Sequence, residues 1–152
     1  MHLIVAFALK ASDGFLKTGD LATIDEGGYC TITGRQKDTI IRGGENIAPS
    51  EVEAVLRGHL SVLDVSLVGV NDAVLGEVLC ACVILHEGEE RTETTAESLR
   101  ELCRKKLAHF KVPKHVRFLD AFPMTVSGKV QKFLLVEASN AELGLSDVRV
   151  GE

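Results

Sequence analysis

The sequence contains no apolar run that approaches the length needed to cross a bilayer, so we expect no membrane-spanning helix. It also lacks a surplus of positive charge, because its formal net charge is −5, and this argues against nucleic acid as a partner. No internal repeat or low-complexity segment interrupts the 152 residues. A composition of 45% hydrophobic and 26% charged residues is typical of a globular protein that can bury its own core.

Cysteine is scarce, and the four cysteines (Cys30, Cys80, Cys82 and Cys103) have no spacing typical of a disulfide framework. Cys80 and Cys82 lie within an apolar run, residues 78–85. A zinc site would need a second pair of ligands at proper spacing, and the sequence offers none. We therefore predict buried, reduced thiols, no metal site and a cytoplasmic location.

The first ten residues are apolar but make a poor signal peptide. The stretch is short, no basic residue precedes it, and it lacks a clear cleavage site. An isolated strand, or a start codon inside a longer reading frame, explains this apolar stretch better. Residues 1–12 are therefore an unassigned leader.

Two hairpins are predicted near the start of the chain. Residues 21–25 and 29–33 read as strands joined by a glycine-containing turn. Residues 39–42 and 45–47 read as a second pair that turns at Gly43-Gly44.

A change to helical periodicity follows the second hairpin. Val52, Val55, Leu56 and Leu60 fall on one helical face. Ser50 and Glu53 are spaced as a capping box, with Pro49 blocking extension of the helix backwards.

The remaining pattern predicts a small α+β domain, with a roughly three-stranded sheet packed by helices. Strands are expected at residues 62–70, 78–85 and 116–119, and the middle one is apolar on both faces, as a central strand would be. Leu99, Leu102, Cys103 and Leu107 predict an amphipathic helix, and residues 130–141 a final one.

Four short motifs occur in a fixed order along this framework. An acidic turn, Thr18-Gly-Asp20, is followed by Gly34-Arg35-Gln-Lys37-Asp38 and by Arg42-Gly-Gly-Glu-Asn-Ile-Ala-Pro49. The last is Pro123-Met-Thr-Val-Ser-Gly-Lys129-Val-Gln-Lys132. Together they resemble the C-terminal portion of adenylate-forming enzymes, the superfamily of acyl-CoA synthetases, luciferases and peptide-synthetase adenylation domains. The resemblance covers roughly residues 13–145, and the form of the Gly43-Gly44 segment looks most like fatty or medium-chain acyl-CoA synthetases.

The resemblance implies a domain layout. Residues 13–36 would be a β-hairpin remnant of a large N-terminal domain, residues 37–145 a C-terminal lid domain, and residues 146–152 a tail. The phosphate loop, acyl pocket and Mg²⁺ ligand of such enzymes lie in the large domain, and the sequence contains none of them.

The resemblance also implies roles for individual residues. Asp20 and Arg35 would bind the ribose of ATP, a carboxylate and a forked guanidinium being suited to hydroxyl groups. Lys37 falls at the hinge, where a side chain need only tolerate a backbone change. Gly43, Gly44 and Glu45 form the turn that would approach CoA pantetheine in the thiol step.

Lys129 is the predicted catalytic residue. By resemblance, its ammonium contacts carboxylate and α-phosphate oxygens as the acyl-adenylate forms. A P-loop is excluded as an alternative, because Val130 follows the lysine and no glycine precedes it at the required distance.

The implied activity is an acid–thiol ligase that uses ATP, CoA and a carboxylate, most simply a fatty acid, and passes through acyl-AMP. The chain by itself is expected to be inactive, because the large domain is not in the sequence. A stand-alone, non-catalytic lid and an adenylation domain that serves a carrier protein are the alternatives. The N-terminal hairpin offers an exposed edge through which two copies could pair.

Overall fold

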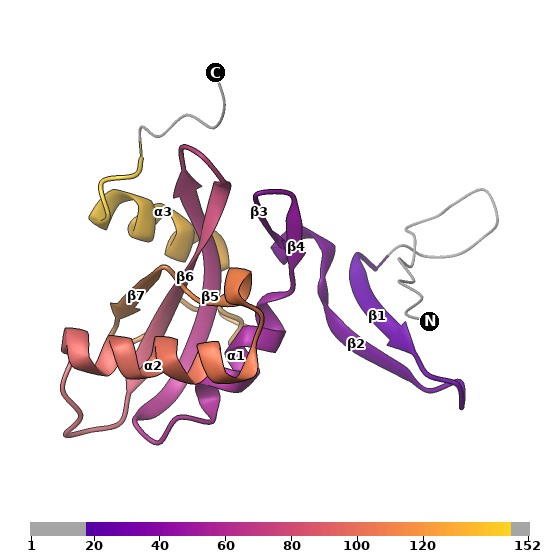
Figure 1. Cartoon of the computed structure of the whole chain (residues 1–152), viewed down its shortest axis with the longest axis horizontal. Helices are drawn as coiled ribbons and strands as arrows, with labels where there is room; N and C mark the ends of the chain where they lie inside the picture. Colours follow the sequence, from indigo (N-terminus) through magenta and orange to yellow (C-terminus); the bar gives the residue numbers. More distant parts are fainter. Residues whose placement is uncertain (1–17, 147–152) are drawn as a thin grey trace. The chain divides into compact units, whose positions relative to one another are not determined.

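The computed structural model describes residues 18–146, and the chain divides into two compact units between Thr39 and Ile40 (Figure 1). The predicted leader, residues 1–12, and all but the first residue of the predicted tail, residues 146–152, lie outside the described residues. The predicted boundary between residues 36 and 37 remains a prediction.

The first unit is built on the predicted hairpin. Strand β1 (Asp20–Ile24) pairs antiparallel with β2 (Cys30–Arg35), with Asp20 opposite Arg35. Asp25 closes the turn, because its Oδ1 accepts hydrogen bonds from the backbone N–H groups of Gly27 and Tyr29 at 2.9 and 3.0 Å. The short 3₁₀ helix η1 (Gln36–Asp38) follows β2.

The second unit contains a five-stranded sheet and confirms the α+β class. Its strands are β3 (Ile40–Arg42), β4 (Glu45–Ile47), β5 (Val62–Asp72), β6 (Gly76–Leu85) and β7 (His115–Phe118). The strand order is β4-β3-β6-β5, and β7 pairs with β6 in parallel. The sheet is wider than the three or so strands expected, because the β3–β4 hairpin joins β6 where Arg42 lies opposite Gly76.

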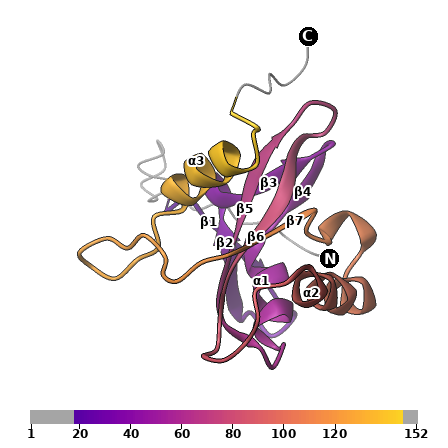
Figure 2. The same cartoon turned by 90° about the vertical axis from the view of Figure 1, so that its left-hand side faces the viewer.

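The central strand β6 contributes side chains to two separate hydrophobic clusters. Leu79, Ala81 and Val83 belong to a cluster with residues of α1 (Pro49–Arg57) and α2 (Glu93–Lys106). The alternate residues of β6 belong to a second cluster, which includes Leu135 of α3 (Lys132–Glu142). Because successive side chains of a strand point to opposite faces, one strand supports both layers. Figure 2 shows the result, with α3 on one side of the sheet and α1 and α2 on the other.

The predicted capping box is wrong. The residue that precedes α1 is Ala48, which makes no side-chain cap, and the helix begins at Pro49. Proline suits this first position, because its fixed φ matches the helix and it has no N–H that needs a partner. The Glu53 carboxylate instead accepts the backbone N–H of Leu67 in β5, at 2.9 Å.

Two further predictions need correction. The first helix ends at Arg57 and is capped by Gly58, so Leu60 lies outside it and is 94% exposed. Cys30 is exposed, unlike the other three cysteines, which are buried; all four are free thiols. Across residues 18–146, none of the helices has the length and apolar character needed to cross a membrane.

Candidate functional site

Asp20 and Arg35 form an ion pair on the hairpin of the first unit. They are direct partners in the register of β1 and β2, and Arg35 Nε donates to Asp20 Oδ1 at 3.1 Å. The side chain of Asp20 is 24% exposed and that of Arg35 is 51% exposed. A carboxylate has more acceptor positions than one guanidinium N–H uses, so this arrangement can still accept hydroxyl groups. The structure thus brings together the two residues predicted to bind ribose, and their role remains a prediction.

Lys37 lies in η1, close to the division between the two units, and its side chain is exposed. No residue of η1 is buried. The segment is held by backbone and hydroxyl contacts, with Gln36 N–H donating to Gly19 O at 2.8 Å and Thr39 Oγ1 to Arg35 O at 3.3 Å. A short element without buried side chains can change its backbone angles at little packing cost, which suits the predicted hinge.

Gly43 and Gly44 form the tight turn between β3 and β4. Their φ angles are +57° and +88°, which favour glycine at both positions of such a turn. Gly43 N–H donates to Leu75 O at 2.8 Å, and a Cβ at Gly43 would lie 3.1 Å from Leu75 Cδ2. A Cβ at Gly44 would meet no atom within 4 Å, so the open side of the turn is at Gly44. Glu45 follows at the start of β4 and is exposed.

Lys129 lies in a hairpin-like loop that leads into α3 and extends away from the sheet (Figure 2). Thr125 and Lys129 exchange contacts across the loop: Thr125 N–H donates to Lys129 O at 2.8 Å, and Lys129 N–H to Thr125 Oγ1 at 3.0 Å. Gly128, with φ +76°, completes the turn. Within the described residues no hydrogen bond or ion pair involves the Lys129 ammonium, and the residue is exposed. The loop therefore has an ordered backbone and presents a cation to solvent.

The loop also carries apolar side chains that the sequence reasoning did not single out. Met124 and Val126 are exposed on it, and Phe133 is exposed at the start of α3. In residues 18–146, no group of three His, Cys, Asp or Glu side chains is placed to hold a metal ion. The resemblance places the Mg²⁺ ligand of such enzymes in the large domain.

The family of AMP-binding enzyme C-terminal domains matches residues 51–129, which include most of α1, the strands β5, β6 and β7, and Lys129. The chain belongs to this family. The match ends at the lysine predicted to be catalytic.

Its relatives include acyl-CoA ligases. The mitochondrial medium-chain acyl-CoA ligase ACSF2 of Bos taurus is 49% identical over 133 residues, and its Homo sapiens counterpart is 48% identical over 133 residues. Each match covers 88% of this chain and 21% of the relative. The chain thus spans about a fifth of the length of these relatives.

Solved structures agree with the fold. An ATP-bound chimera of RpMatB and BxBclM has a TM-score of 0.82 at 38% identity and covers 91% of this chain and 26% of its own. The o-succinylbenzoate CoA synthetase of Bacillus subtilis, in complex with its acyl-adenylate intermediate, has a TM-score of 0.74 at 36% identity. That match covers 92% of this chain and 26% of the synthetase. The fold is that of the C-terminal domain of adenylate-forming enzymes.

Proposed function

We propose that the chain is the C-terminal part of an acid–thiol ligase, which activates a carboxylate with ATP to acyl-AMP and transfers the acyl group to CoA. The observation that carries the proposal is the 49% identity to a medium-chain acyl-CoA ligase across nearly the whole chain. A fatty carboxylate of medium length is accordingly the first substrate to test.

Lys129 serves the first half-reaction. When a carboxylate oxygen attacks the α-phosphorus of ATP, pyrophosphate leaves and negative charge builds on the oxygens around phosphorus. A cation placed against those oxygens stabilises the transition state more than the ground state. The exposed Lys129 ammonium, carried on an ordered loop, can reach such a group without first breaking an ion pair to another described residue.

Asp20 and Arg35 bind the ribose in the same step. The Arg35 guanidinium fixes one oxygen of the Asp20 carboxylate, which restricts the rotamers of the carboxylate. The ribose hydroxyls then donate to this pre-oriented acceptor, which lowers the entropy cost of binding.

The Gly43-Gly44 turn serves the second half-reaction, in which the CoA thiol attacks the acyl carbonyl and AMP leaves. No described atom lies within 4 Å of a Cβ position at Gly44, so a pantetheine arm can approach the backbone there. Rotation at Lys37 would exchange the Lys129 loop for this turn.

The chain alone, without a large AMP-binding domain, should not turn over ATP. We also propose a cytoplasmic location and retain pairing of two copies through the β1–β2 hairpin as a hypothesis. A fluorescent fusion and analytical ultracentrifugation test these two points, and a mitochondrial signal or a monomer at all concentrations would contradict them.

The substrate class can be tested in a fusion of the full chain to the large domain of the Bos taurus ligase. Acyl-CoA formation is measured with short-, medium- and long-chain fatty acids and with aromatic acids. We expect ATP-dependent acyl-CoA formation with AMP as product, fastest for a fatty acid. Formation of ADP, or no product with any acid, would contradict the proposal.

A further inference from the structure

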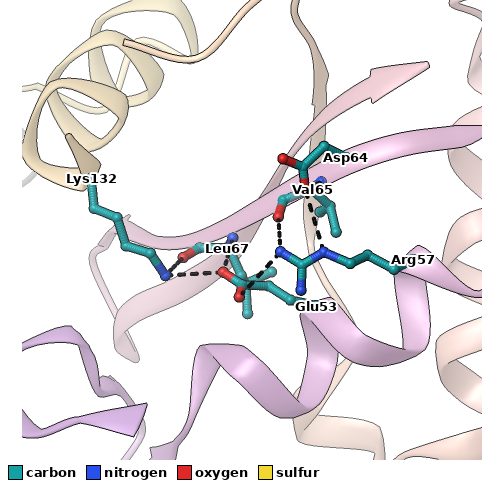
Figure 3. Close-up of polar contacts among 6 residues, drawn as sticks. All are labelled: Glu53, Arg57, Asp64, Val65, Leu67 and Lys132. Atoms are coloured by element: carbon teal, nitrogen blue, oxygen red, sulfur yellow. Dashed lines mark hydrogen bonds and ion pairs between the residues drawn. The ribbon is translucent and has the colours of Figure 1, made fainter. Parts of the chain in front are cut away.

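An ion pair between Glu53 and Lys132 joins the two helical layers of the second unit. Glu53 lies on α1, and Lys132 is the first residue of α3. Lys132 Nζ donates to Glu53 Oε1 at 2.9 Å, and the two side chains are 28% and 12% exposed for Lys132 and Glu53 respectively. Figure 3 shows the two side chains approaching from opposite sides and meeting beside the backbone of Leu67.

Both charges also bind the backbone of β5. The Leu67 N–H donates to Glu53 Oε1 at 2.9 Å, and the Leu67 carbonyl accepts from Lys132 Nζ at 3.2 Å. Strand β5 is the last in the sheet order, and among the described residues no strand pairs with its outer edge. On an edge strand, an outward N–H group needs an acceptor and an outward carbonyl group needs a donor. The Glu53 carboxylate and the Lys132 ammonium supply both to Leu67. We call Glu53, Lys132 and the Leu67 backbone the edge clasp.

At the neighbouring edge position, the carbonyl group of Val65 is satisfied by α1 and its N–H group by Asp64 of β5 itself. Arg57 donates to Val65 O at 3.0 Å and pairs with Asp64 at 3.3 Å, while Asp64 accepts the Val65 N–H at 2.8 Å (Figure 3). This second set of contacts could keep α1 on β5 without α3. The edge clasp therefore ties the first turn of α3 to this edge, whereas Asn140, near the other end of α3, accepts the Asn71 N–H of β5 at 2.9 Å.

The position of Lys132 is unusual for a purely structural lysine. A cation at the N-terminus of a helix is disfavoured by the helix dipole, and α3 has no acidic residue in its first turn. The Gln131 side chain does not cap the helix either. The Glu53 carboxylate compensates the charge of Lys132 from outside the helix.

Lys132 also lies directly after the loop that carries Lys129. The base of that loop is closed where Gln131 N–H donates to Pro123 O and Gln131 Nε2 to Met124 O, both at 2.8 Å. The contacts within the loop fix its shape, whereas its direction relative to the sheet depends on how its two ends are held: Phe122 precedes it and is buried in the cluster that includes Leu135, and the first turn of α3 follows it. The edge clasp holds that turn one residue beyond the base.

We infer that Glu53 and Lys132 are positioning residues for acyl-AMP formation. They fix the orientation of the loop that carries Lys129. The inference rests on the proposed function. Lys132 itself touches no reacting atom: it orients the loop, and Lys129 acts on the substrate. The Gly43-Gly44 turn leads into β4, and α1 begins just after β4. Because Glu53 lies on α1, the edge clasp also connects the Lys129 loop to the helix that follows this hairpin.

The test uses the full chain joined to the large domain of the Bos taurus ligase, with Lys132→Met, Lys132→Arg and Glu53→Gln variants. Lys111→Met is the matched control, because Lys111 also pairs with a glutamate of α1, Glu51, at 2.6 Å, but lies in the short helix η2 (His109–Lys111) and not in α3. Fatty-acid-dependent ATP–pyrophosphate exchange reports acyl-AMP formation, and CoA transfer is measured separately from preformed acyl-AMP.

For Lys132→Met we expect the kcat of exchange to fall about tenfold to a hundredfold, since small misplacement of a catalytic group has effects of this order. The KM for ATP and the rate of CoA transfer should change much less. Lys132→Arg should recover most of the exchange, because a guanidinium can donate to both Glu53 and Leu67 O. Glu53→Gln should be intermediate, since it keeps an acceptor for the Leu67 N–H, and Lys111→Met should match the unsubstituted protein.

Three results would overturn the inference. These are unchanged exchange in Lys132→Met, an equal fall in both half-reactions, or no recovery in a folded Lys132→Arg variant, with folding followed by thermal unfolding. Absence of exchange in the unsubstituted fusion has a different meaning: it contradicts the proposed function itself and the inference with it.

Discussion

Replacing Gly69 with alanine should loosen the β3–β4 hairpin from the sheet. Gly69 lies in β5, on the same face as Glu77 of β6, and the Glu77 carboxylate accepts the Ile41 N–H of β3 at 2.8 Å. A Cβ at Gly69 would lie 2.8 Å from Glu77 Oε1 and 3.2 Å from Ile40 Cγ2. The carboxylate would have to move, and its hydrogen bond to β3 would be lost.

The expected cost follows from these contacts. A hydrogen bond to a charged group contributes about 1.5–3 kcal/mol. Alanine recovers roughly 0.5–1 kcal/mol of backbone entropy relative to glycine in a strand. The Gly69→Ala variant should therefore lose about 1–2 kcal/mol of unfolding free energy, which is a fall of about 0.5–1 M in urea midpoint at an m-value of about 2 kcal/mol/M.

A double-mutant cycle isolates the mechanism. In a Glu77→Ala background no carboxylate is displaced, so Gly69→Ala should become neutral or stabilising. Amide hydrogen exchange at Ile41 should accelerate in Gly69→Ala and in Glu77→Ala to a similar extent. If the cost of Gly69→Ala is the same with and without Glu77, the reasoning from the Glu77–Ile41 contact is wrong.

Three further predictions concern separate parts of the chain. Gly44→Leu in the fusion should slow CoA transfer from preformed acyl-AMP and spare pyrophosphate exchange, because the open side of the turn is then obstructed; a fall in exchange alone would contradict the assignment. The pKa of Asp72 is lowered from 3.8 to about 2, because Lys114 donates to its carboxylate and so do the N–H groups of Leu75 and Val74. A carboxyl group with a depressed folded-state pKa stabilises above its unfolded pKa, so stability should fall between about pH 4 and pH 2 and Asp72→Asn should lack this part of the loss in acid unfolding. Native-state labelling with a thiol reagent should modify Cys30 rapidly and leave Cys80, Cys82 and Cys103 unreacted, and fast labelling of a second site would show that the core opens.

Short-range signals in the sequence were sufficient for the hairpins and most of the helices. The Gly43-Gly44 turn follows from the glycine pair, and the structure gives both residues the positive φ that such a turn requires. The apolar run of β6 predicted a central strand, and the strand does supply both hydrophobic clusters. The end of α1 was missed because Gly58 stops the helix before the periodic Leu60.

Long-range polar contacts could not be predicted from the sequence. The spacing of Ser50 and Glu53 indicated a capping box, but Glu53 binds Leu67 and Lys132, which lie 14 and 79 residues away in the chain. The parallel pairing of β7 with β6 likewise depends on how α2 crosses the sheet. The candidate site contains both kinds of contact. Asp20 pairs with Arg35 within one hairpin, whereas the Gly43 N–H donates to the carbonyl of Leu75, far along the chain.

We propose that Lys129 of this chain acts in a site that forms acyl-AMP. The most direct measurement is fatty-acid-dependent ATP–pyrophosphate exchange in the fusion, compared with the Lys129→Ala variant and with the large domain and the chain assayed alone. We predict exchange in the fusion, none in the chain alone, and a loss of about a hundredfold to a thousandfold in Lys129→Ala, as for removal of one charge-stabilising group. CoA transfer from preformed acyl-AMP should persist in that variant. Undiminished exchange in a folded Lys129→Ala variant, or exchange as fast in the large domain alone, would contradict the claim.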